Sequence, residues 1–415
     1  MRCTCSRLHM TSRRHVCIAL SLLALLWSTP AIAQKVTTKE ELTGAATLRE
    51  LTGPLGTRPV AEAIALATAM EIATTPVAMS SGNFQFRLDP ATGLLVRTTA
   101  TFGPAFAERA NTSGEGQVTV GASFMSSTYE KLSGLDLGRM QLGSLSSASP
   151  ALARTGVANL AINAKTTMIS SVIGVTQNLD VGVGVPLVSV KLTGVSTLTN
   201  GSGVVTRLAE GGGTFSGLGD ISALAKYRFV RFGTELNDTG GIAVLVNSHL
   251  PTGSRDNLRG LGVTRTLVAG VASGAIGRIR PHVNGGFEYW SKGIQVPVNY
   301  ATGATVEARH QIQYAAGVEV EASPKLTLMV TFIGRHLQGA GQVGFVTDTT
   351  GLPAGITASE SAVALGDGIR KIIAAPGLKV NLTGKMLLSV HALATMKNDG
   401  LEPKVTPVAS LDLTF

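Results

Sequence analysis

Apolar and polar residues alternate with a period of two along several long stretches of the chain. Within residues 278–290, Ile279 and Phe287 fall on one face and Glu288 falls on the other. Successive side chains of a β-strand point to opposite faces, so the pattern predicts strands with one apolar and one polar face. Residues 304–322 keep this period far beyond the usual strand length of about five or six residues. Such long strands are typical of membrane barrels rather than of soluble sandwiches.

Twelve stretches of this kind follow one another to the end of the chain. They are residues 117–129, 158–176, 179–192, 219–232, 241–252, 264–276, 278–290, 304–322, 325–338, 369–382, 385–397 and 405–415. Bacterial single-chain barrels have an even number of antiparallel strands. We therefore predict an all-β fold, a transmembrane antiparallel β-barrel of about 12 strands (12–14), preceded by a short, partly helical N-terminal segment.

The connections between these stretches are short and long in turn. Gln177-Asn178, Gly277 and Gly384 are short, whereas 130–157 and 339–368 are long. Outer-membrane barrels have short periplasmic turns and longer extracellular loops. The alternation predicts that both ends of the barrel lie at the periplasmic side and that the long loops lie outside the cell.

The last stretch ends in Phe415. An alternating strand with a C-terminal Phe resembles the signal by which outer-membrane proteins enter their assembly machinery. We expect that machinery and outer-membrane lipid as partners. An ordinary edge strand that happens to end in Phe is the alternative.

Two stretches fit the pattern less well. Residues 158–176 alternate poorly, and in 179–192 the apolar phase changes between Leu187 and Val188, beside Pro186. A β-bulge at this proline would restore both faces, so we expect one there.

The first 33 residues have the order of a secretory signal peptide. Basic residues end at Arg14, an apolar stretch runs from Val16 to Trp27, and small residues precede the expected cleavage after Ala33. A membrane anchor is the alternative, but the apolar stretch is shorter than the ~20 residues that a spanning helix needs. We expect export to the cell outer membrane. All three cysteines lie in this segment (Cys3, Cys5 and Cys17). The mature chain would therefore have no disulfide, cysteine metal ligand or cysteine nucleophile.

Residues 34–82 differ from the rest of the chain. Residues 39–51 and 59–73 predict helices, and the segment is either a periplasmic extension or a plug in the barrel lumen. Residues 84–102 contain a turn signal between two short apolar runs and predict a leading hairpin. We place the barrel, this hairpin included, at residues 83–415.

Composition and charge exclude several function classes. Charged residues make up 15% of the chain, against a usual share of about 25%, and aromatic residues make up 5%, few for aromatic girdles. The net charge is +9, and Arg2, Arg7, Arg13 and Arg14 contribute four of these positive charges within the first 14 residues. The remaining basic residues are scattered, so we expect no nucleic-acid partner.

The polar phase of the strands supplies candidate lumen-facing residues. The candidates are Lys226, Arg228, Arg278, Arg280, His282, Glu288, Arg309, Glu319 and Arg335. Such charges form structural ion pairs across adjacent strands more often than a binding site. Arg278 and Arg280 stand two apart on one strand and are the best candidates for steering an anionic group.

Motifs for catalysis or cofactor binding are missing from the sequence. No serine-hydrolase, zinc-protease or phosphate-loop motif is present. The glycines of 339–344 match dinucleotide-binding spacing, but no helix signal follows them, so we interpret them as a loop. We therefore predict no catalytic residue, cofactor or metal site, and no enzyme.

Several strings resemble one family of outer-membrane proteins. They are Phe102-Gly-Pro-Ala-Phe-Ala-Glu-Arg109, the string from Val175 to Val188, Gly217-Leu-Gly-Asp-Ile-Ser-Ala-Leu-Ala-Lys-Tyr-Arg-Phe229 and Leu250-Pro-Thr-Gly253. Over roughly residues 80–295, the chain resembles the barrel transporters labelled as phenol-degradation meta-pathway proteins, which are distantly FadL-like. The resemblance implies a barrel and the uptake of aromatic or other hydrophobic compounds. It assigns no binding residues.

The leading functional hypothesis is an outer-membrane channel or transporter for passive or facilitated uptake of small molecules, hydrophobic or aromatic ones among them. The alternatives are a barrel enzyme of the phospholipase type and a non-conducting structural or adhesin barrel. A Ser–His enzyme needs its hydroxyl within hydrogen-bond reach of a histidine. Ser248 and His249 do not qualify, because neighbours on one strand point to opposite faces.

Overall fold

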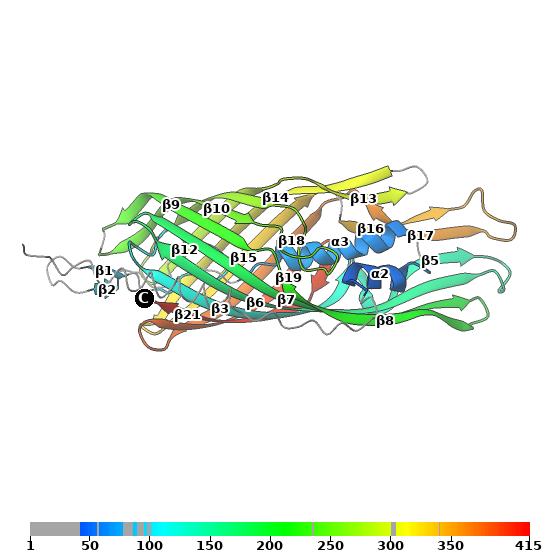
Figure 1. Ribbon diagram of the computed structural model, residues 1–415, viewed down its shortest axis with the longest axis horizontal. Coiled ribbons are helices and arrows are strands. Elements are labelled where there is room, and N and C mark those ends of the chain that lie inside the picture. Colours follow the sequence, from blue (N-terminus) through cyan, green and yellow to red (C-terminus); the bar gives the residue numbers. More distant parts are fainter. Residues whose placement is uncertain are drawn as a thin grey trace, which may run out of the picture.

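The chain folds into a closed antiparallel β-barrel of twelve strands with two short helices at its N-terminal side (Figure 1). The computed structural model describes residues 42–55, 58–77, 86–88, 95–97, 101–234, 236–299, 304–339 and 341–415. The predicted fold class is confirmed. The signal peptide, its cleavage site and the boundary at residue 82 lie outside the described residues.

The wall strands coincide with the twelve stretches of alternating sequence. They are β3 (Val118–Leu132), β6 (Arg154–Gly174), β7 (Leu179–Asn200), β9 (Ser222–Gly233), β10 (Asp238–His249), β11 (Arg265–Ser273), β12 (Ile279–Trp290), β14 (Ala304–Ser323), β15 (Leu326–Gln338), β18 (Ile369–Asn381), β19 (Met386–Asn398) and β21 (Val405–Thr414). Each pairs antiparallel with its neighbours, and β21 pairs with β3 to close the barrel. Closure leaves no open edge around the wall, which a β-structure in lipid requires.

Seven further strands of the described residues extend the wall at the end opposite the C-terminus (Figure 1). They are β4 (Leu135–Asp136), β5 (Met140–Ser146), β8 (Val205–Leu218), β13 (Ile294–Asn299), β16 (Gln342–Asp348), β17 (Ala358–Leu365) and β20 (Leu401–Pro403), with the 3-10 turn η2 (Leu137–Arg139). All of them belong to the connections that alternate with the short turns, namely 130–157, 193–218, 291–303, 339–368 and the shortest of these, 398–404. The short connections lie together at the other end.

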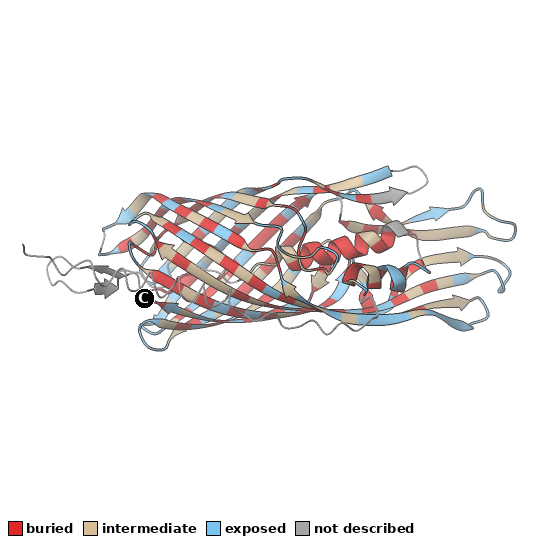
Figure 2. Cartoon of the chain, viewed as in Figure 1, coloured by how far each residue is buried: buried red, intermediate tan, exposed pale blue. Residues whose placement is uncertain are grey.

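On β9 and β12 the outward side chains are mainly apolar, and the inward phase carries polar groups. Val283 is 52% exposed and Tyr227 53%, whereas Lys226 and Glu288 in the alternate phase are buried. Figure 2 shows this alternation of buried and exposed residues along the strands. Although aromatic residues are few, many of them lie exposed on this outer face (Phe124, Tyr227, Phe229, Phe287, Tyr289, Tyr314 and Phe332).

The predicted bulge at Pro186 is wrong. β6 and β7 pair without a register shift from Gly174–Asp180 to Arg154–Asn200. Even-numbered residues of β7 face inward throughout, from Asp180 to Val188 and beyond. The apolar phase changes because the polarity of the lumen changes along the barrel. The inner face is polar in the half that carries the C-terminus and apolar in the other half, where helices pack against it.

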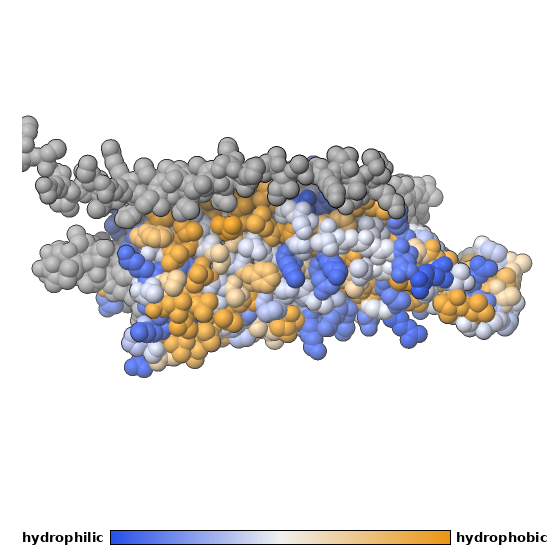
Figure 3. All heavy atoms as spheres, turned by 60° about the horizontal axis from the view of Figure 1, so that its bottom comes forward, coloured by the Kyte–Doolittle hydropathy of each residue, from blue (hydrophilic) through white to orange (hydrophobic). Residues whose placement is uncertain are grey.

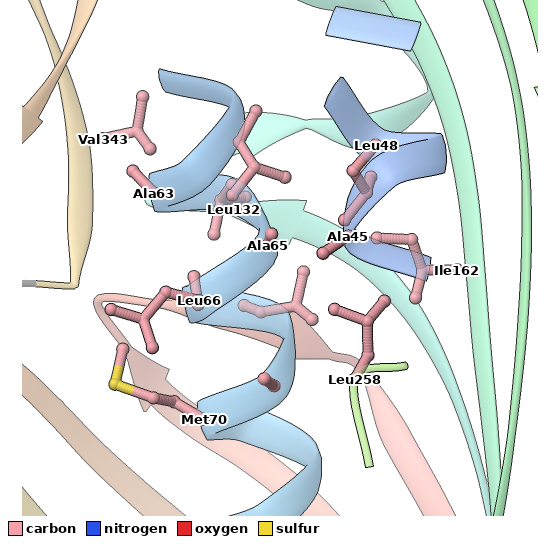
Figure 4. Close-up of a cluster of buried hydrophobic side chains, with 14 of the residues drawn as sticks. Ala45, Leu48, Ala63, Ala65, Leu66, Met70, Leu132, Ile162, Leu258 and Val343 are labelled. Carbon is pink, nitrogen blue, oxygen red and sulfur yellow. The ribbon is translucent and has the colours of Figure 1, made fainter. Parts of the chain in front are cut away.

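Two helices line the inner wall there (Figure 4). They are α2 (Gly44–Thr52) and α3 (Arg58–Thr74). Leu48 of α2 and Ile64 of α3 share one buried cluster with Ile162, Val190 and Trp290 of the wall. Thr43 caps α2, because its hydroxyl accepts a hydrogen bond from the backbone N–H of Ala46 at 3.3 Å.

The helix α3 is apolar on nearly every side. Its residues from Val60 to Ile72 are almost all buried, as expected for a helix enclosed by protein. No helix of the described residues is long and apolar enough to cross a membrane. The predicted hairpin forms as β1 (Phe86–Leu88) and β2 (Leu95–Arg97), but as a two-stranded sheet separate from the barrel rather than as part of it.

Candidate functional site in the barrel lumen

Residues 101–114, named here the lumenal segment, cross the interior of the barrel just before β3 begins. Phe102, Ala110 and Ser113 are fully buried. The segment contacts strands on different sides of the wall. Thr327 of β15 lies 3.4 Å from the backbone nitrogen of Phe102, and Ser273 of β11 accepts a hydrogen bond from the backbone of Ala110 at 3.1 Å. The chain thus places a segment that precedes the wall inside its own lumen.

Glu108 holds the middle of the lumenal segment. Its carboxylate lies 3.0 Å from the ammonium group of Lys226 on β9, and Asp180 lies 3.8 Å from the same group. Asn284 of β12 binds the backbone of Glu108 twice, accepting from its N–H and donating to its carbonyl, each at 2.8 Å. Removing one partner of a buried ion pair usually costs about 3–5 kcal/mol, because the other charge is left buried without compensation.

Arg109 provides a second charged anchor. Its guanidinium lies 3.5 Å from Glu319 of β14 and donates to the hydroxyl of Thr101 at 3.0 Å. His282 lies 3.5 Å from the other oxygen of Glu319. Gly103 makes room for this arrangement: its φ is +76°, and a Cβ there would lie 3.0 Å from the guanidinium.

The ends of the segment are held by polar contacts as well. Asn111 donates to Asp238 at 2.7 Å, and the backbone of Ser113 donates to Asp180 at 3.0 Å. The ring of Phe106 meets His391 of β19 edge to face at 5.2 Å. Hydrogen bonds and ion pairs of this kind can be exchanged for water, which makes displacement of the segment physically reasonable.

Arginines from the wall cap the C-terminal end of α3. Arg265 donates to the carbonyl of Ala73 at 3.0 Å, and Arg335 donates to that of Thr74. The last carbonyls of a helix are unpaired and carry partial negative charge, so cations stabilise them. Lys371 pairs with Glu71 one turn earlier. The wall charges therefore fix the position of the helix.

Glu288 connects one side chain of its own strand, β12, with two of the neighbouring strand β14. It accepts hydrogen bonds from the indole of Trp290 at 2.8 Å and from Gln311 and Gln313 at 2.8 and 2.7 Å. Arg265 lies 3.5 Å away. A buried carboxylate is stable only with such partners, so the cluster keeps a charge inside the barrel.

A cavity of about 210 Å³ lies between the end of α3, the lumenal segment and the wall. Phe106, Met168 and Leu224 line its apolar side, and Asn247 and Gln313 belong to its polar side. The carbonyl oxygen of Asn247 is buried and accepts no hydrogen bond from the described part of the chain. The cavity therefore offers an apolar surface with an unused hydrogen-bond acceptor.

Six of the nine predicted lumen-facing residues lie buried in the lumen. They are Lys226, Arg228, His282, Glu288, Glu319 and Arg335. Arg228 pairs with Asp238 across β9 and β10, an ion pair between adjacent strands of the predicted kind. Lys226, Lys371 and Arg335 instead bind the N-terminal segments inside the barrel.

Arg278 and Arg280 do not form an anion-steering pair in the lumen. Arg278 lies exposed in the turn before β12. Arg280 bends back over that turn and donates to the carbonyl of Gly277 at 2.6 Å. The strand begins only at Ile279, so the alternation does not extend to Arg278.

Arg309 lies on the outer face rather than in the lumen. Its exposed side chain is 3.5 Å from Glu307. His310 has a φ of +50°, and the register between β14 and β15 shifts at this point. The bulge reverses the phase, so Ala308 turns inward toward the helices.

The lumenal segment itself has a signal in the sequence that phase analysis of the strands does not use. Glu108 and Arg109 are the charged residues of an otherwise uncharged run from 98 to 114. Their string is one that carries the family resemblance, yet it assigns them no role. Within the described ranges, no group of three or more His, Cys, Asp or Glu side chains could hold a metal ion.

Comparison with known proteins identifies no family. No family model matches the chain, and no curated protein matches it. Among solved structures, an outer membrane channel from Pseudomonas putida F1 is 12% identical, covers 74% of this chain and 98% of its own, and gives a TM-score of 0.45. A Pseudomonas aeruginosa FadL homologue is 11% identical, with coverage of 82% and 98% and a TM-score of 0.32. Salmonella typhi OmpF is 9% identical, with coverage of 74% and 98% and a TM-score of 0.27.

Proposed function

We propose that this protein is an outer-membrane channel through which small molecules enter the cell, and that the lumenal segment is its gate. The observation that carries the proposal is a closed wall whose lumen holds, in its polar half, a segment fixed mainly through polar contacts. A closed barrel can span a bilayer because every backbone group of the wall is paired. Displacing residues 101–114 would open the polar half of the lumen, beside α2 and α3, to water.

The cavity suggests the class of substrate. Phe106, Met168 and Leu224 suit an apolar body, and Asn247 suits a hydroxyl or amine hydrogen. We propose small molecules with one or two hydrogen-bonding groups, aromatic compounds among them. The family resemblance of the sequence points in the same direction.

Two alternatives remain to be separated by experiment. A phospholipase-type enzyme would need a serine beside a histidine. Within the described residues, the histidine hydrogen bonds go to Asn247, Thr331 and the backbone of Trp290, not to a serine. A non-conducting barrel would keep the lumenal segment in place permanently.

Liposome swelling with the purified protein tests the channel directly. We expect entry of small solutes, faster entry of small aromatic alcohols than of sugars of equal size, and a steep loss of rate for solutes much larger than the cavity of about 210 Å³. Protein-free liposomes are the control. Swelling no faster than this control for every solute would contradict the proposal, and release of fatty acid from the liposomes would favour the enzyme.

A further inference from the structure

The outer face of β3, β6, β7 and β8 has an abrupt border between apolar and polar rows. Strand pairing places Phe124, Thr167, Leu187 and Leu218 side by side in one row. Phe124, Leu187 and Leu218 are 48%, 44% and 43% exposed. These side chains would lie against the hydrocarbon of a membrane.

The next two rows toward the hairpins are entirely polar. Their positions, in strand order, are Ser126, Lys165, Ser189 and Ser216, then Thr128, Asn163, Lys191 and Thr214. We name these eight residues the polar patch. Figure 3 shows this side of the barrel, with apolar side chains gathered toward the end that carries the C-terminus and hydrophilic ones in the middle.

The two lysines of the polar patch are diagonal neighbours. Lys165 is paired with Ser189, and Lys191 is paired with Asn163. The two lysines therefore lie on adjacent strands in adjacent outward-facing rows. Diagonal neighbours are about 7–8 Å apart, within joint reach of one anionic group for side chains of this length. Neither lysine forms an ion pair with another described residue.

The surroundings of the lysines are neutral and rich in hydrogen-bonding groups. Thr128 donates to Asn163 at 2.8 Å, and the hydroxyls of Ser189 and Ser216 lie 2.8 Å apart. On these strands the outward carboxylates, Glu130 and Glu210, lie beyond the patch toward the hairpin tips. The patch therefore keeps a local positive charge directly beside the apolar row that contains Phe124, Leu187 and Leu218, on its side toward the hairpins.

We propose that the polar patch binds the phosphorylated glucosamine head group of lipid A in the outer leaflet. The lysines contact a phosphate, the hydroxyl and amide side chains contact the sugar, and the acyl chains cover Phe124, Leu187 and Leu218. One amphiphile with an anionic sugar head and several chains matches all three rows at once. This inference concerns the outer face and is independent of the gate in the lumen.

The test is binding of lipid A to the purified protein in detergent micelles. A basic residue near an anionic lipid surface contributes about 1 kcal/mol, so K165Q/K191Q should bind lipid A about 30-fold more weakly than wild type. The charge-matched control is K325Q/K385Q, which removes two exposed lysines from turns at the opposite end of the barrel. The control should change the affinity less than threefold. Heat-modifiable migration in gel electrophoresis and unchanged solute flux show that both variants keep the folded barrel.

Two further titrations identify the ligand. Lipid A without phosphates should bind wild type about as weakly as intact lipid A binds K165Q/K191Q. Inorganic phosphate at millimolar concentration should not displace lipid A. Equal affinities of wild type and K165Q/K191Q would overturn the proposal, as would tight binding of the dephosphorylated lipid. Displacement by phosphate alone would mean a site for a free anion instead of a lipid.

Discussion

Glu108→Ala should raise the open probability of the channel about 100-fold. Glu108 and Lys226 are both buried and lie 3.0 Å apart, so the substitution removes the nearer of the two carboxylates around a buried ammonium group. Asp180 at 3.8 Å retains part of the pairing, and we therefore take the lower end of the usual cost, about 3 kcal/mol. This penalty falls on the closed state, because Lys226 would be hydrated once the lumenal segment has moved. A difference of this size changes a two-state equilibrium by roughly two powers of ten.

Single-channel recording in planar bilayers measures this change. The control is Glu210→Ala, which removes the carboxylate of an exposed pair with Arg207. Exposed ion pairs contribute about 0–1 kcal/mol, and this one is far from the lumenal segment, so the control should leave the open probability unchanged. If Glu108→Ala conducts no more often than wild type, Glu108 does not hold the gate.

Val283→Arg should destabilise the protein in lipid by about 2–4 kcal/mol. Val283 is 52% exposed on the outer face of β12, between Ile279 and Phe287 of the same apolar phase. A guanidinium at this depth would have to enter hydrocarbon. The cost should appear as a lower urea midpoint and a lower folding yield in lipid vesicles.

Thr347→Arg is the matched control for this substitution. Thr347 is exposed on β16, a strand of the hairpin region beyond the apolar belt, so the same new charge stays in water. We expect a change within about 0.5 kcal/mol, as for ordinary surface substitutions. An equal loss of stability for both variants would mean that β12 does not face lipid.

The strands of the wall could be predicted from the sequence because the pattern that indicates each strand lies within that strand. A period of two shows the strand, and the lengths of the connections show the two ends of the barrel. The stretches 219–232 and 405–415 correspond closely to β9 and β21. These features need no knowledge of what lies inside the barrel.

The phase of the strands was harder to predict where the lumen is not uniformly polar. Val188 and Val190 face inward because α2 and α3 pack against the inner wall in that half of the barrel. From the sequence alone, two inward valines are indistinguishable from two lipid-facing ones. At His310 a β-bulge in β14 changes the phase of the strand. It turns Ala308 inward and Arg309 outward.

The partners of the lumenal charges could not be predicted from strand patterns at all. Lys226 binds Glu108, which is 118 positions earlier in the chain, and Lys371 binds Glu71, 300 positions earlier. Ion pairs across adjacent strands follow from register, but a segment that crosses the lumen has no register. The isolated Glu108-Arg109 pair in an uncharged stretch is the local signal for such a segment.

Locking the lumenal segment to the wall tests the account most directly. The backbone of Ala110 lies 3.1 Å from the hydroxyl of Ser273 on β11, and the chain has no cysteine after residue 33, so A110C/S273C offers one defined disulfide. The control S248C/T266C joins β10 to β11 within the wall, where the two hydroxyls lie 3.0 Å apart. The measurement is solute flux and conductance of both variants before and after reduction. With the disulfide formed, A110C/S273C should be closed and should recover on reduction, while the control conducts like wild type in both states. Conduction by oxidised A110C/S273C at the wild-type level would contradict the account, because solutes would then pass without movement of the segment.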